Sequence, residues 1–171
     1  MRIGIDFDNT IADTWDVIKH LCPHRNNYYE LTKDEDMDIA LNHLNDLTMN
    51  TKLISGVKKA FDFLHSSNVE IFLITARGIA NPEIINVTKK YLENHDIYFD
   101  YYIFREDKKS KVCIENKIDL LIDDNEKVID EVASHGIDVL KFGSSSIKYD
   151  FVLSWDEAVK YIKERMIKWE L

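Results

Sequence analysis

Two pairs of aspartates stand at the ends of apolar runs, where charge is costly. Asp6 and Asp8 close the run RIGIDFD, and Asp123 and Asp124 close the run IDLLIDD. Two carboxylates about 4 Å apart repel each other by roughly 4 kcal/mol at an effective dielectric of about 20. Carboxylate, backbone carbonyl and water oxygens are the ligands that Mg²⁺ prefers. The pattern therefore predicts a Mg²⁺ site built from these four aspartates.

A carboxylate in such a site can also act as a nucleophile and form an aspartyl-phosphate. A divalent cation and a nearby lysine would remove the repulsion between Asp6 and a phosphate dianion. The candidate lysines are Lys108, Lys109 and Lys111, which precede IDLLIDD. Thr75 follows the run VEIFLI and could offer its hydroxyl and its backbone N–H to a phosphoryl oxygen.

Other residue types that could do chemistry have simpler explanations. Asp13 precedes a helical pattern and is best explained as a helix N-cap. The six histidines are scattered, and the two cysteines, Cys22 and Cys113, lie far apart, so zinc is not expected. Cysteines without a pairing pattern indicate reduced thiols, and we expect a cytoplasmic protein.

Composition narrows the range of partners. The chain has 171 residues, which fits one domain with a small insertion. Its net charge of −9 argues against a nucleic acid polymer as the partner, because phosphate backbones need a basic face. We see no secretion signal and no apolar stretch near the roughly 20 residues of a membrane span, so we expect no membrane association.

Strand and helix patterns alternate along the chain. Apolar runs without strict alternation are typical of strands covered on both faces, and strands alternating with helices indicate a parallel sheet. We therefore predict an α/β fold with a Rossmann-like parallel sheet, whose ligands bind at the carboxyl ends of the strands. The expected strands are 2–7, 69–75, 118–123 and 137–142, with weaker ones at 100–104 and 150–154. The expected helices are 55–66, 81–95, 109–116, 125–135 and one that begins at the sequence SWDE.

One segment breaks this alternation. Residues 14–54 contain no convincing strand but have polar helical patterns. We interpret 14–54 as a small helical cap inserted after the first strand, and 1–13 with 55–171 as the α/β core. A long connection of this kind usually has a function.

Four short motifs, in order, resemble those of the haloacid dehalogenase-like (HAD) phosphohydrolases. DFDNT resembles motif I, LITAR motif II, and KSKVCIENKIDLLIDDN motifs III and IV. The resemblance implies the HAD fold and a Mg²⁺-dependent phosphatase that forms an aspartyl-phosphate. The second acid of DFDNT favours phosphate esters over halides, because an alcohol leaving group must be protonated.

The resemblance also implies roles for individual residues. Asp6 would be the nucleophile and Asp8 the general acid and base, with Thr75 and Lys109 completing the catalytic set; Lys111 stays open as an alternative to Lys109. Asp6, the backbone carbonyl of Asp8 and Asp123 would bind Mg²⁺, and Asp124 would act through water. The expected substrate-binding residues are Thr75, Ala76, Arg77 and Lys109, and for Arg77 a contact with the cap is the open alternative to a contact with phosphate.

The substrate would be a small phosphorylated metabolite. LITAR, IDLLIDD and the helical insert are similar to the 5′-nucleotidase and deoxyribonucleotidase branch, so we favour a nucleotide. A sugar-phosphate phosphatase or mutase on the same scaffold is the alternative, and a non-enzymatic receiver-like domain is a remote one. In the cap, Trp15, Tyr28 and Tyr29 could stack on a base, and His24 and Arg25 could meet a sugar or phosphate. For each of these residues we favour packing within the cap or solvation as the explanation.

Overall fold

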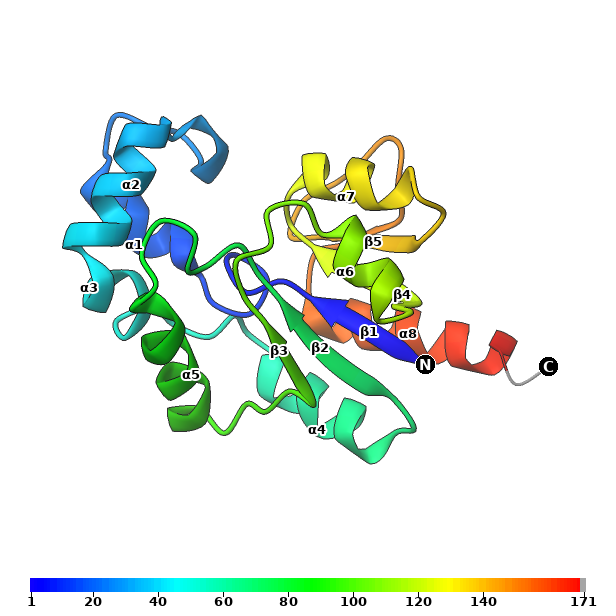
Figure 1. The fold of residues 1–171 in the computed structure, drawn as a ribbon. Coiled ribbons are helices and arrows are strands. Elements are labelled where there is room, and N and C mark those ends of the chain that lie inside the picture. Colours follow the sequence, from blue (N-terminus) through cyan, green and yellow to red (C-terminus); the bar gives the residue numbers. More distant parts are fainter. Residues whose placement is uncertain (170–171) are drawn as a thin grey trace.

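The computed structural model describes the backbone of residues 1–169 and the side chains of residues 1–167. Its strands form one parallel sheet in the order β3-β2-β1-β4-β5-β6 (Figure 1). The predicted α/β class with a parallel sheet is confirmed. The strands are β1 (Arg2–Ile5), β2 (Glu70–Ile74), β3 (Tyr101–Ile103), β4 (Leu120–Asp123), β5 (Asp138–Phe142) and β6 (Phe151–Val152).

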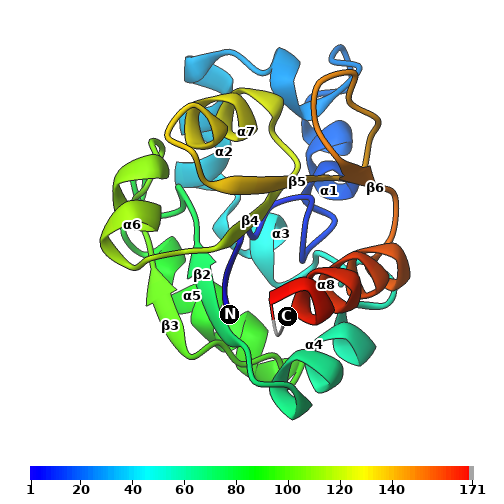
Figure 2. The ribbon, with the colours of Figure 1, turned by 90° about the vertical axis from the view of Figure 1, so that its right-hand side faces the viewer.

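Helices cover both faces of this sheet, as the near-continuous apolar strands require. Apolar side chains of α4, α5 and α8 pack on one face, and those of α6 and α7 pack on the other. Figure 2 shows α6 and α7 on one side of the sheet and α4 and α8 on the opposite side. These helices are α4 (Val57–Ser66), α5 (Ile84–Asn94), α6 (Ser110–Glu115), α7 (Glu126–Ala133) and α8 (Trp155–Trp169).

The central strand β1 is short and tightly packed. A Cβ atom added at Gly4 would lie 2.8 Å from Cδ1 of Ile74 and 3.1 Å from Cδ1 of Leu121. Gly4 therefore lets the apolar side chains of the neighbouring strands close over the middle of the sheet. Ile3 and Ile5 on either side of it are fully buried.

Residues 14–54 form four helical segments and contribute no strand to the sheet. They have a small apolar cluster of their own, in which Ile18, Ile39 and Leu47 pack together and contact Ile84 of α5. Figure 1 shows these segments, in blue to cyan, grouped on the side to which β1 and β2 point. The segments are α1 (Thr14–Leu21), η1 (Tyr28–Glu30), α2 (Lys33–Asn42) and α3 (Leu44–Thr48).

Most predicted elements occur within a few residues of the expected positions. The helix expected over 81–95 begins later, at Ile84. Asn81 caps the preceding turn instead, with its Oδ1 accepting a hydrogen bond from the N–H of Glu83 at 3.0 Å. Asp13 is the N-cap of α1, as expected, and accepts from the N–H of Asp16. Among residues 1–169 no helix is both long and apolar enough to cross a membrane.

Candidate active site

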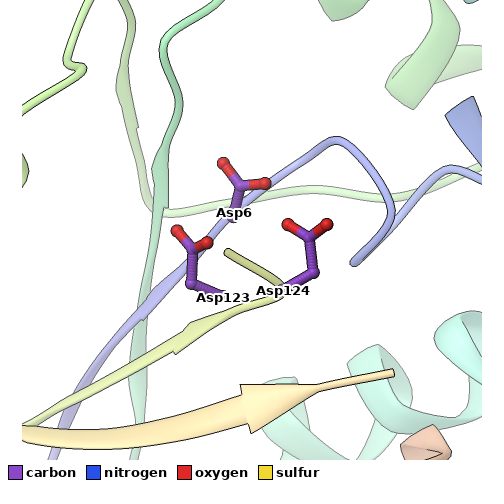
Figure 3. A group of neighbouring side chains, drawn as sticks. All are labelled: Asp6, Asp123 and Asp124. Carbon is purple, nitrogen blue, oxygen red and sulfur yellow. The ribbon is translucent and has the colours of Figure 1, made fainter. Parts of the chain in front are cut away.

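Three aspartates meet at the carboxyl edge of the sheet. Strand register brings them together, because β1 and β4 are adjacent and the N–H of Asp6 donates to the carbonyl of Ile122 at 3.0 Å. One carboxylate oxygen from each of Asp6, Asp123 and Asp124 lies within 4.8 Å of the other two. Figure 3 shows the three carboxylates facing a shared space, Asp6 directly after β1, Asp123 at the end of β4 and Asp124 directly after it.

Lys109 supplies a positive charge inside this cluster. Its Nζ lies 2.5 Å from Oδ1 of Asp6 and 2.7 Å from Oδ2 of Asp123. The side chain is 3% exposed, so solvent screens these ion pairs little. Lys111, the alternative considered from the sequence, is exposed and points to Glu115 at 3.9 Å. The structure therefore places Lys109, not Lys111, among the aspartates.

Asp8 lies on a tight loop that follows β1. The backbone N–H groups of Ile11 and Ala12 both donate to the carbonyl of Phe7, which folds the chain back on itself. Asn9 takes a left-handed conformation with φ of 58°, which asparagine tolerates better than most residues. This loop turns the Asp8 carboxylate toward the start of α1, where the hydroxyl of Thr14 donates to its Oδ1 at 2.6 Å.

Arg77 occupies the other side of Asp8. Its Nη2 lies 2.7 Å from Oδ1, and its Nε lies 3.0 Å from Oδ2 of the carboxylate. Burial by itself would raise the pKa of Asp8, but the charge and hydrogen bonds of Arg77, with the hydroxyl of Thr14, hold it below its usual value. Arg77 and Thr14 thus hold the carboxyl group of Asp8 in a fixed orientation.

Of the two roles that the sequence leaves open for Arg77, a phosphate contact or a cap contact, its hydrogen bonds match the cap contact. The remaining N–H groups of its guanidinium donate to Thr48 Oγ1 at 2.6 Å, to Thr88 Oγ1 at 3.0 Å and to the carbonyl of Leu47 at 3.3 Å. The guanidinium carbon lies 4.2 Å from the centre of the Phe7 ring. All five N–H groups are used within the protein, so none is left for a phosphate.

Thr75 follows β2 and is buried beside the aspartates. Its backbone N–H, expected from the sequence to be free, instead donates to the carbonyl of Ile103 at 3.0 Å. Thr75 and Ala76 line the site cavity, and Oγ1 of Thr75 accepts a hydrogen bond from the N–H of Arg77 at 3.2 Å. The N–H of Ala76 finds no acceptor among the described residues, so Thr75 Oγ1 and Ala76 N–H are the available donors here.

Two tyrosines of the 14–54 segment reach the site, which sequence reasoning raised only as base-stacking candidates. The Tyr29 hydroxyl lies 2.5 Å from Oδ2 and 2.8 Å from the carbonyl oxygen of Asp124. Tyr28 lines the same cavity. His24 and Arg25 instead contact the carboxylate of Glu35, at 2.5 and 3.1 Å, which agrees with packing within the cap.

The charges of the site are incompletely balanced by protein groups. Four carboxylates, those of the two aspartate pairs, face two buried cations, Lys109 and Arg77, which leaves a formal charge of −2. Burial raises the pKa of Asp6 well above its usual value, and Lys109 offsets only part of this. Burial and the charge of Asp123 raise the pKa of Asp124 to about 7. An all-oxygen donor set with this excess charge fits a hard divalent cation such as Mg²⁺.

Two adjoining cavities open at this edge. The first, of about 170 Å³, is lined by Asp6, Thr75, Lys109 and the other groups described above. The second, of about 360 Å³, lies between the cap segment and residues 76–84, which lead from β2 into α5. Both are bordered by Asp8, Tyr28, Ala76 and Asp107. The walls of the second cavity are mainly apolar, with Ile18, Met37, Ala40, Leu47, Ile79 and Ile84.

No family model matches the chain, and no curated protein matches it in sequence. Solved structures do resemble it. A predicted phosphatase from Clostridium acetobutylicum superposes with a TM-score of 0.69 at 16% identity, over 95% of this chain and 98% of that one.

Two provisionally named proteins match similarly. They are the HAD-hydrolase YfnB from Bacillus subtilis, bound to magnesium, and a beta-phosphoglucomutase from Thermotoga maritima. The Bacillus protein superposes with a TM-score of 0.66 at 12% identity, over 94% of this chain and 97% of that one. The Thermotoga protein superposes with a TM-score of 0.62 at 16% identity, over 95% of this chain and 98% of that one. The chain therefore has the fold of HAD-superfamily hydrolases.

Proposed function

We propose that this protein is a Mg²⁺-dependent phosphomonoester hydrolase that works through an aspartyl-phosphate on Asp6. The observation that carries the proposal is the convergence of Asp6, Asp123, Asp124 and Lys109 at the carboxyl edge of the sheet. The shared fold with HAD-superfamily hydrolases supports it.

The residues have distinct roles in this proposal. Asp8 takes up a proton from solvent before the reaction; Asp6 then attacks phosphorus, the bond to the leaving oxygen breaks, and Asp8 passes that proton to the oxygen. Asp8 then takes a proton from water as the water attacks the aspartyl-phosphate, which releases phosphate and restores Asp6. Thr75 Oγ1, Ala76 N–H and Lys109 donate to the phosphoryl oxygens, where negative charge must be held.

Asp6, Asp123 and the backbone carbonyl of Asp8 would hold Mg²⁺, with Asp124 acting through water. The ion would supply charge neutralisation, which lets an anionic nucleophile approach an anionic phosphate. Lys109 shares this task, because its ammonium group contacts the carboxylates of both Asp6 and Asp123.

The test is hydrolysis of 4-nitrophenyl phosphate by a D6N variant in the presence of Mg²⁺. We expect D6N to lose at least about 1,000-fold in kcat, because the nucleophile is absent. D13N is the matched control, since Asp13 is a helix cap in the same segment and asparagine caps equally well. Circular dichroism should show both variants folded, and near-normal turnover by folded D6N would refute the proposal.

The second cavity is the candidate site for the leaving group. It borders Asp8, the proposed acid, and is about twice the size of the first. The structural comparisons include a phosphatase and a provisionally named beta-phosphoglucomutase. They favour a sugar phosphate or another small phosphorylated metabolite over the nucleotide that the motifs suggested.

A nucleotide is the second candidate, because the apolar walls of the second cavity suit a planar base better than a bare sugar. A panel of phosphorylated metabolites, compared by kcat/KM with Mg²⁺, separates the two. A preference of about 100-fold, equal to about 2.7 kcal/mol, for either class would decide between them.

A further inference from the structure

We infer that Arg77 is a positioning residue for the general acid, and that it connects Asp8 to the cap segment. The inference rests on the proposed function, and it concerns what Arg77 does in that reaction. It builds on the cap contact, one of the two roles that the sequence left open for this residue.

The first support is the buried ion pair between the guanidinium of Arg77 and the carboxylate of Asp8. Arg77 and Asp8 form a two-point ion pair, and the arginine side chain is 4% exposed. A planar fork with fixed N–H directions holds a carboxylate in one orientation, which a lysine cannot do. Arg77 therefore fixes where the Asp8 carboxylate points rather than merely balancing its charge.

The second support is the asymmetry of the two Asp8 oxygens. Oδ1 accepts short hydrogen bonds from Thr14 at 2.6 Å and from Arg77 Nη2 at 2.7 Å. Oδ2 accepts only from Arg77 Nε, at 3.0 Å. Oδ2 therefore keeps a lone pair that accepts no hydrogen bond, and this is the position that can carry a proton to a leaving group. Arg77 and Thr14 determine this position, because their hydrogen bonds occupy Oδ1.

The third support is where the other N–H groups of Arg77 go. They bind Thr48 and the carbonyl of Leu47, both in α3 of the cap segment, and Thr88 in α5. Thr48 and Thr88 are fully buried, so these anchors are rigid. The orientation of Asp8 is thereby tied to the seating of α3 on α5.

The test compares two substrates that differ in their need for an acid. An alkyl phosphate requires a proton on its leaving oxygen, whereas 4-nitrophenyl phosphate leaves as a stable anion. For R77K we expect kcat/KM to fall about 100-fold with the alkyl phosphate and less than about 5-fold with 4-nitrophenyl phosphate. Inhibition by inorganic phosphate should keep the same constant, because the phosphoryl site is intact.

A substrate-binding arginine would give a different pattern. R77K would then lower kcat/KM equally for both substrates and weaken inhibition by phosphate, and that result would overturn the inference. Absence of hydrolysis by the wild-type protein would instead defeat the proposed function, so the two failures are distinguishable.

A second variant covers the case in which R77K does not fold. The double variant T48V/T88V keeps the ion pair and the side-chain volumes but removes two anchors, and we expect about a 10-fold loss confined to the alkyl phosphate. Equal rates to wild type with both substrates would contradict the inference. R2K is the matched control, since Arg2 pairs with Glu70 at the start of β1, far from the site.

Discussion

The ammonium group of Lys109 lies 2.5 Å from Oδ1 of Asp6, in an ion pair that is almost entirely buried. The same ammonium contacts Asp123, so one cation joins the carboxylates that end β1 and β4. Burial of Lys109 would by itself lower its pKa, but the charges of Asp123 and Asp6 raise it above its usual value. Lys109 therefore stays charged throughout the physiological range.

The first prediction concerns this lysine. K109M leaves two buried carboxylates without their cation, and breaking such a pair costs about 3–5 kcal/mol. We expect the free energy of unfolding, from urea titration without Mg²⁺, to fall by about that amount, and added Mg²⁺ to restore part of it. Hydrolysis should also fall by at least about 100-fold.

K111M is the control for K109M, because Lys111 is exposed and makes only a long contact with Glu115. It should change the free energy of unfolding by less than about 0.5 kcal/mol. Equal losses of unfolding free energy and of hydrolysis in K109M and K111M would contradict the role given to Lys109 among the aspartates.

The second prediction concerns Tyr29, whose hydroxyl lies against the carboxylate of Asp124. Groups that orient metal-binding carboxylates typically change metal affinity by about 10-fold when removed, so Y29F should raise the Kd for Mg²⁺ by about that factor. Calorimetric titration with MgCl₂ measures it directly. Y161F, which removes a similar hydroxyl contact to Asp150, should leave the Kd for Mg²⁺ unchanged. An equal increase of the Kd in Y161F would contradict the claim that Tyr29 orients Asp124 for metal binding.

The third prediction concerns pH and the cap segment. The Glu35 carboxylate accepts from the N–H of Thr32 and contacts His24 and Arg25, and these hydrogen bonds lower its pKa from 4.5 to about 2. A depressed pKa in the folded state gives stability that is present above the unfolded value and is lost as the pH falls toward about 2. The stability difference between wild type and E35Q should therefore shrink between pH 5 and pH 3.

Urea titrations at the two pH values provide the measurement for Glu35. E115Q, which removes a carboxylate from an exposed helix face, is the matched control. A wild-type advantage over E35Q that stayed constant, or grew, toward low pH would contradict this account of the cap.

The fourth prediction concerns the second cavity. Ile79 lines it and is 53% exposed, so its truncation should not disturb the core. Loss of an apolar wall contact is worth about 1 kcal/mol, and I79A should lower kcat/KM for a substrate with a bulky apolar leaving group by about 5-fold. I147A, at a fully exposed position, is the control. Unchanged kcat/KM in I79A, with every substrate tested, would argue that leaving groups lie elsewhere.

The strands and their acidic ends could be predicted from the sequence because each depends on local patterns. Apolar runs of strand length identify β1, β2, β4 and β5, and parallel strands must end at one edge of the sheet. The juxtaposition of Asp6 with Asp123 follows once these two strands are neighbours. The choice between Lys109 and Lys111 could not be made, because it depends on how the chain enters α6.

The contacts of Arg77 and Tyr29 could not be predicted for a different reason. The partners of Arg77 come from three segments distant in sequence, at Asp8, Thr48 and Thr88. No local pattern shows that two buried threonines will accept from the same guanidinium. Tyr29 reaches Asp124 only because the 14–54 segment packs over this edge of the sheet, and polar helical patterns do not fix such packing.

Direct trapping of the covalent intermediate tests the central claim. The wild-type protein is mixed with Mg²⁺ and a rapidly hydrolysed phosphate ester, quenched in acid during turnover, and treated with borohydride, which reduces an acyl phosphate to an alcohol. Mass spectrometry of the peptide RIGIDFDNT should then show homoserine at position 6 and unmodified Asp8. Turnover without modification of Asp6, or with modification at another residue, would contradict the claim that Asp6 attacks phosphorus.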